Sequence, residues 1–161
     1  MKKWIFVLIT AAAAGLAIPS MTLAQHAHGQ GAAAGGGGMK MDTREVLVEG
    51  VKVVFQIMTN AEHQKMLTDM KSKEEPEKGT THNIAVVLTD EKTKKEIMGA
   101  QVKMKLLDPK GGEQVKSLRA SEAMKSFDNY FNLPDKGQYQ LLVAFKIGDQ
   151  TRSAGVYYDR K

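Results

Sequence analysis

Short segments in which apolar and polar residues alternate recur from residue 45 to residue 158, and this pattern constrains the fold most. In Tyr139–Ile147 every second residue is apolar, and the turn sequences Asp108–Gly112 and Pro134–Gly137 separate neighbouring segments. Alternation with period two is typical of strands that bury one face. The expected strands are 45–48, 52–58, 84–89, 98–107, 114–120, 125–133, 139–147 and 152–158.

One segment interrupts the strand pattern. Asn60 is a suitable helix cap, Glu62 would lie in the first turn, and Pro76 follows the last helical residue. A short helix or ordered loop is therefore expected near 60–73. Together these features predict an all-β fold, an immunoglobulin-like antiparallel β-sandwich of about seven strands with one insertion.

The N-terminus has the organisation of a secretory signal peptide. Lys2 and Lys3 precede an apolar run that ends before Pro19, and small residues up to Ala24 suit cleavage there. The alternative is an uncleaved membrane anchor, but the run is shorter than the roughly 20 residues needed to span a bilayer. We expect a signal peptide at 1–24, a flexible Gly/Ala/His tether at 25–43, a β-sandwich domain at 44–161, and a periplasmic location.

Composition and motifs exclude several functions. The net charge of +5 comes from interleaved basic and acidic residues, which argues against nucleic-acid binding, and the chain has no cysteine. It contains no Gly-x-Ser-x-Gly motif of a serine nucleophile, no His-Glu-x-x-His motif of a zinc protease and no phosphate-binding glycine loop. Three aspartates are expected in turns, where they would bond the backbone: Asp108, Asp128 and Asp135. We therefore expect no catalytic residues and no enzyme activity.

Methionine and histidine are the residues that suggest chemistry. The chain has ten methionines and four histidines. Thioether and imidazole ligands suit copper, particularly Cu(I) in an oxidising compartment without thiols. Two of the histidines, His26 and His28, fall in the expected tether, and their part in binding stays open.

His63, Met66 and Met70 form the first candidate group. Their spacing places all three on one face of a helix, near enough to share a metal ion. The alternative is an apolar stripe in which the two methionines, together with Leu67, dock the helix on the sheet. The sequence leaves both interpretations open.

His82 is the second candidate. It shares strand parity with Ile84, so its side chain should point toward the core near the end of a sheet. There it would act as a metal ligand or as a hydrogen-bonded structural residue. Met98 is expected to approach His82 across a hairpin, whereas Met104 should lie in the core.

From residue 81 onward the chain resembles small periplasmic proteins with YtkA-like and FixH-like domains. The resemblance rests on the passages Thr81-His82-Asn83-Ile84, Met98-Gly99-Ala100-Gln101-Val102, Asp108-Pro109-Lys110-Gly111 and Leu133-Pro134-Asp135-Lys136-Gly137-Gln138-Tyr139. It implies an immunoglobulin-like sandwich and, in metal-binding members, ligands at the positions of His82 and Met124. The histidine expected after Met124 is missing here, because Lys125, Ser126 and Phe127 follow it.

Two functions follow from these patterns. The first is a periplasmic metal-binding protein, a copper carrier or chaperone that binds Cu(I) and transfers it to a periplasmic or membrane protein partner. Its metal ligands would come from His82, Met124, Met98, His63, Met66 and Met70. The second is a non-catalytic envelope accessory or protein-interaction β-sandwich, with methionine as an adaptable core filler.

Overall fold

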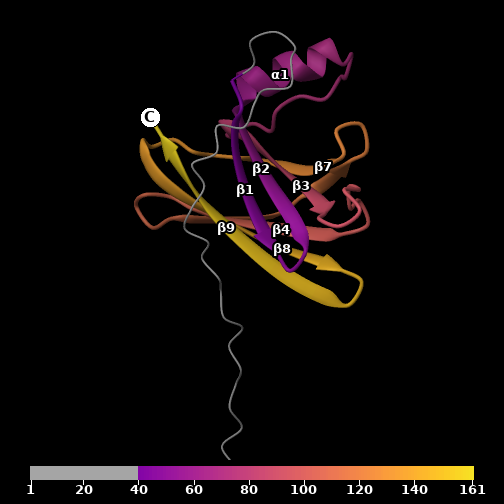
Figure 1. Cartoon of the computed structure of the whole chain (residues 1–161). Coiled ribbons are helices and arrows are strands. Elements are labelled where there is room, and N and C mark those ends of the chain that lie inside the picture. The colour runs from indigo at the N-terminus through magenta and orange to yellow at the C-terminus, as the bar shows by residue number, and fades with distance from the viewer. Residues whose placement is uncertain (1–39) are drawn as a thin grey trace, which may run out of the picture.

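The computed structural model describes residues 40–161, which form two antiparallel sheets packed as a sandwich (Figure 1). One sheet has five strands in the order β1-β2-β3-β7-β6, and the other has four in the order β5-β4-β8-β9. The elements are β1 (Asp42–Val48), β2 (Val51–Thr59), α1 (Asn60–Asp69), β3 (His82–Asp90), β4 (Gln101–Leu107), β5 (Glu113–Ser117), β6 (Arg119–Ser121), β7 (Ser126–Phe131), β8 (Gly137–Ile147) and β9 (Gln150–Arg160).

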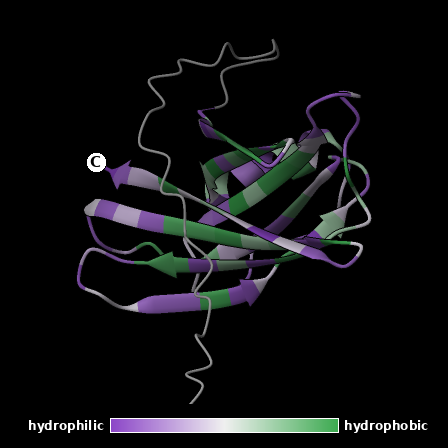
Figure 2. Ribbon diagram, turned by 60° about the horizontal axis from the view of Figure 1, so that its bottom comes forward, coloured by the Kyte–Doolittle hydropathy of each residue, from purple (hydrophilic) through white to green (hydrophobic). Residues whose placement is uncertain are grey.

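The core lies between the inner faces of the two sheets. In the five-stranded sheet Phe55 is paired with Val86 and Ile57 with Ile84, and all four side chains are buried. Met104 on β4 is fully buried, as the sequence predicted. Apolar and polar residues alternate along the strands in Figure 2, which is the pattern of a sheet with one face in the core.

The predicted sandwich is confirmed, with three differences in detail. The structure has nine strands in the described part of the chain, because the expected strand at 114–120 divides at Leu118 into β5 and β6, which belong to different sheets. Residues 98–100 precede β4 and are not part of it. The domain begins with β1 at Asp42, slightly before the expected start. The expected signal peptide and most of the expected tether lie outside the described residues.

The expected insertion is the helix α1 followed by a loop, and we name residues 60–81 the strap. A capping box starts the helix: the Thr59 hydroxyl accepts the Glu62 backbone N–H at 3.2 Å, and the Glu62 carboxylate accepts the Thr59 N–H at 2.9 Å. The two ends of the strap meet where Asn60 N–H donates to the Thr81 carbonyl at 2.9 Å. Among residues 40–161 no helix is long and apolar enough to cross a membrane.

The turn before β8 is held by a buried tyrosine. The Tyr139 hydroxyl donates to the Asp135 carbonyl at 2.9 Å and accepts the Asp135 N–H at 3.1 Å. A tyrosine that bonds the backbone a few residues upstream is a feature of immunoglobulin-like sandwiches. Asp108 bonds the turn backbone as expected, since its carboxylate accepts the N–H groups of Lys110 and Gly112. The Asp135 carboxylate instead accepts from the Lys110 side chain at 2.7 Å.

Candidate functional site

At one end of the sandwich the apolar core gives way to inward-facing polar residues. Strand register places these residues on the inner faces: Asp42 and Arg44 are paired with Ile57 and Phe55, and Tyr158 is paired with Tyr139. We name this end of the sandwich the mouth. Its inward-facing residues are Asp42, Arg44, Thr59, His82, Tyr158 and Arg160, which line a hollow of about 560 Å³ together with Asp159 and Lys161.

His82 occupies the inner wall of the mouth. The residue is 4 % exposed, and its ring meets the Tyr158 ring edge-on with 6.3 Å between centroids. Nδ1 lies 2.8 Å from the Thr81 hydroxyl, which also accepts the Leu133 N–H. Nε2 makes no hydrogen bond to the described residues, so one ring nitrogen is held in place and the other remains available for a ligand.

The electrostatics of the mouth keep this imidazole neutral. Burial lowers the pKa of His82, the positive charge of Arg160 lowers it further, and the Glu62 carboxylate has the opposite effect. A neutral imidazole is the form that binds a metal ion. Burial also raises the pKa of the Tyr158 hydroxyl, which therefore stays protonated.

Two methionines lie beside the mouth. A second hollow of about 460 Å³ shares Asp42, Thr59 and Tyr158 with the first and is lined by Met41 and Met58. Met41 is 44 % exposed, whereas Met58 is 5 % exposed. The sequence interpretation placed Met41 in the tether, because its own segment shows no strand pattern.

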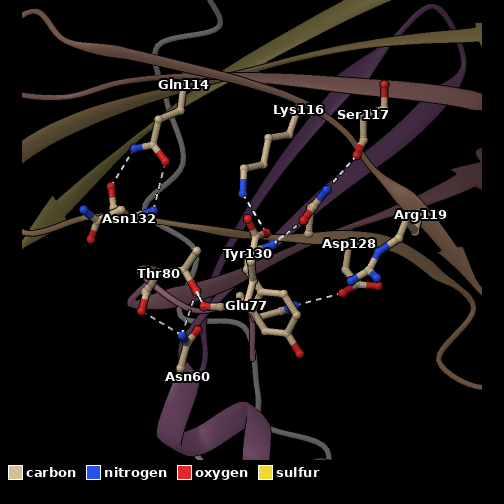
Figure 3. A network of polar contacts seen from close by, with 12 residues as sticks. Asn60, Glu77, Thr80, Gln114, Lys116, Ser117, Arg119, Asp128, Tyr130 and Asn132 are labelled. Carbon is tan, nitrogen blue, oxygen red and sulfur yellow. Dashed lines mark hydrogen bonds and ion pairs between the residues drawn. The ribbon is translucent and has the colours of Figure 1, made fainter. Parts of the chain in front are cut away.

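His63 lies on the opposite, outer face of the five-stranded sheet and is separated from His82 by that sheet. The strap covers this face, and the His63 Nδ1 atom lies 3.0 Å from the Tyr130 hydroxyl. Asn83 donates to the Asp128 carboxylate at 2.8 Å in the same layer. Figure 3 shows Tyr130 and Asp128 beside the ion pair between Glu77 of the strap and Lys116.

This layer is a buried polar cluster. His63 is fully buried, and its Nε2 atom has no hydrogen-bond partner among the described residues. Burial lowers its pKa against the opposing carboxylates of Asp128 and Glu74, and burial also raises the pKa of Tyr130 to about 12. The expectation that Asp128 lies in a turn is wrong: it is a buried residue of β7, because Ser126 and Asp128 alternate with core residues.

The predicted helix face does not form a three-residue site. Met66 is half-buried, and Met70 is the C-cap of α1 with 45 % of its surface exposed. The spacing of these residues was correct, but the sheet covers only the side of α1 that carries His63 and Leu67. His63 therefore contacts Tyr130 instead of sharing a ligand with Met70.

Met98 and Met124 lie at the end of β3 away from His82. The Ile97 N–H donates to the Leu88 carbonyl at 2.8 Å, and Met124 precedes β7, whose Phe127 is paired with Val86. A strand rises about 3.3 Å per residue, so Leu88 is roughly 20 Å from His82. The expected approach of Met98 to His82 is wrong, because the chain before β4 is bound to the opposite end of β3.

The six predicted ligands therefore do not converge on one point. Within residues 40–161 no group of three or more His, Cys, Asp or Glu side chains is arranged to hold a metal ion. Sequence reasoning identified His82 and its inward direction but missed its neighbours at the mouth. The strand parity of Arg44, Tyr158 and Arg160 was available in the sequence, but which strand ends meet was not.

Fold and site together define a β-sandwich with a polar mouth at one end. No protein-family model matches the chain, and no curated protein matches it. Among solved structures it is similar to FetP of uropathogenic Escherichia coli strain F11, which was expressed recombinantly in the periplasm of E. coli BL21(DE3). The TM-score is 0.55 at 9 % sequence identity, over 76 % of this chain and 98 % of FetP. At this identity the likeness establishes the fold.

Proposed function

We propose that the chain is a periplasmic metal-binding protein that carries copper, with His82 as the principal ligand. The observation that carries this proposal is the placement of His82: its Nδ1 atom is held by the Thr81 hydroxyl, burial lowers the pKa of its ring, and the residue lines an open hollow. The signal-like N-terminus and the fold shared with FetP, a protein expressed in the periplasm, support the location. The resemblance to YtkA-like and FixH-like domains supports the same position for a ligand.

The other donors near His82 define what kind of site this is. Asp42 supplies a carboxylate at the mouth, and Met41 supplies an exposed thioether in the adjoining hollow. One histidine with few further protein ligands gives an open coordination sphere. Such a site suits a carrier, which must release its metal to a partner protein, better than it suits a permanent metal centre.

Copper titration of the mature chain, residues 25–161, tests the proposal. We expect one equivalent of copper to bind, and we expect His82→Ala to weaken binding by about tenfold or more, since a ligand is lost. His63→Ala is the matched control, because His63 is also buried but lies on the other face of the sheet. Circular dichroism establishes that both variants fold.

Two results would contradict a copper site at the mouth. One is wild-type binding no tighter than that of a control peptide carrying a histidine tag. The other is an equal loss of affinity in His63→Ala and His82→Ala. Titration of a His26→Ala/His28→Ala variant shows separately whether the N-terminal histidines contribute.

The second candidate function is a non-catalytic envelope accessory that binds another protein. The observation in its favour is that Met104 and Met58 are buried and Met98 packs against the core, so much of the methionine content serves packing. This function predicts that metal ions leave the protein unchanged. The titration above therefore separates the two functions.

A further inference from the structure

Three arginines point inward on the two edge strands β1 and β9. Arg44 on β1 is paired with Phe55, and on β9 Arg152 and Arg160 stand at either end of the buried residues Ala154 and Tyr158. Inward-pointing charges on edge strands discourage pairing with another chain. That role alone would be served equally by all three arginines.

The hydrogen-bond partners of these arginines differ between the two ends of the sandwich. Away from the mouth, Arg152 Nε donates to the Glu49 carboxylate at 3.0 Å, so its charge is neutralised. At the mouth, Arg160 donates to the Pro134 carbonyl at 2.8 Å and has no carboxylate partner in the described part of the chain. Arg44 donates to the Thr43 carbonyl at 2.9 Å and reaches Asp42 only at 3.5 Å.

The mouth therefore carries unused hydrogen-bond donors beside the carboxylates of Asp42 and Asp159. A guanidinium has five N–H groups, and most of those of Arg44 and Arg160 are unused by the described residues. The Tyr158 hydroxyl also has no hydrogen-bond partner among residues 40–161, and Lys161 is one of the residues that line the hollow.

We propose that the mouth binds a small oxyanion, a carboxylate or phosphate compound, through Arg44, Arg160 and Tyr158. The planar fork of arginine matches the paired oxygens of these groups, and such charge-assisted bonds are strong. A hollow of about 560 Å³ has room for a tricarboxylate. The anion would occupy the hollow whether or not a metal is bound to His82, so this inference goes beyond the copper proposal.

Calorimetric titration of the metal-free, dialysed mature chain with citrate and with inorganic phosphate tests this inference. Sodium chloride at matched ionic strength is the reference for non-specific screening. We expect saturable binding of at least one of the two anions. We also expect Arg160→Gln to weaken it by about tenfold or more, because a charged hydrogen-bond donor is lost.

Arg152→Gln is the matched control, since it removes an inward arginine from the same strand at the other end of the sandwich. It should leave anion affinity unchanged, and Arg44→Gln should reduce it. A thermal shift on adding citrate, present in wild type and Arg152→Gln but absent in Arg160→Gln, provides a second readout. Heat effects that chloride reproduces, or equal losses in Arg152→Gln and Arg160→Gln, would overturn the inference.

The copper proposal and the anion proposal can be refuted independently of each other. His82→Ala should lose copper but keep most of its affinity for the anion, whereas Arg160→Gln should lose the anion and keep copper. A wild-type chain that binds citrate but no copper refutes only the copper site. A chain that binds copper but neither citrate nor phosphate refutes only the anion site.

Discussion

Two of the four histidines, His63 and His82, are buried in the described structure, and burial lowers the pKa of both. The surroundings of the two side chains differ. His63 is enclosed between the strap and the sheet with Tyr130 as its partner, whereas His82 borders an open hollow. The sequence placed His63 on a helix and His82 on a strand, but it could not show which of the two borders an open hollow. The difference arises from which face of the five-stranded sheet each side chain occupies.

The lowered pKa of His63 makes stability depend on pH. In the unfolded chain the imidazole titrates near 6.5, but in the folded chain it resists protonation. Below about pH 6.5 the unfolded state therefore binds more protons, and the free energy of unfolding falls as pH falls toward the folded pKa. His82 contributes in the same direction. Urea unfolding at pH 7.5, 6.5 and 5.5 measures this slope.

His63→Gln should flatten the pH slope and destabilise the fold at pH 7.5 by about 1–3 kcal/mol, because the Tyr130 hydroxyl loses its buried partner. Gln64→Ala, at the half-buried neighbouring residue of α1 that does not titrate, is the control and should leave the slope unchanged. A slope identical in wild type and His63→Gln would mean that His63 does not titrate between the two states.

At the scale of elements, α1 depends on its cap and on contacts with the sheet. An isolated helix of ten residues is marginal in water, and only His63 and Leu67 of α1 are buried. The capping box at Thr59 supplies part of the stability that so short a helix lacks.

Thr59→Ala should lower the free energy of unfolding by about 1 kcal/mol, since the cap on the first turn is removed. Thr68→Ala removes a hydroxyl that bonds the Gln64 carbonyl inside the same helix, and it should change stability by much less. Chemical denaturation of the three proteins measures the comparison. Equal effects at the two threonines would show that the cap does not stabilise the helix.

The Tyr139 hydroxyl should stabilise the turn before β8. Tyr139→Phe leaves the part-buried N–H and carbonyl of Asp135 without that partner, so we expect a loss of about 1–3 kcal/mol in unfolding free energy. Tyr157→Phe is the control on the exposed face of β9, and it should be neutral within about 0.5 kcal/mol. A neutral Tyr139→Phe would contradict a structural role for the hydroxyl.

The strands were predictable where alternation was clear, as in β4 and β8. The division at Leu118 was not, because a chain that crosses from one sheet to the other keeps the same period of two. The buried outer face of the five-stranded sheet was also missed. Asn83 and Asp128 are polar residues whose burial depends on the strap, and only the folded chain brings that cover over them.

At the scale of the whole molecule, the candidate site depends on which strand ends meet. The inward direction of His82 followed from its parity with Ile84, and the structure agrees. The meeting of β1 and β9 at the mouth did not follow from any local pattern, because these strands lie at opposite ends of the domain and in different sheets. The metal ligands that were predicted from residue type alone therefore lie in three separate regions of the fold.

Among the described residues 40–161, the core cluster runs from Val46 to Tyr158. We therefore predict that residues 40–161 fold without the preceding residues, with a melting temperature within a few degrees of that of residues 25–161. Differential scanning calorimetry of both chains measures this. A drop of about 5 °C or more would show that residues before 40 contribute to the fold.

Arg44 and Arg160 of the mouth belong to different sheets, and this has a consequence for how the domain resists force and proteolysis. β1 and β9 lie side by side at the open edge of the sandwich, but no strand pairing joins their two sheets within residues 40–161 (Figure 1). A ligand that contacts Arg44 on one strand and Arg160 on the other would join the two sheets non-covalently. In a chain without disulfides, the occupied mouth would then act as a reversible crosslink, and loss of the ligand would let the two layers separate more readily.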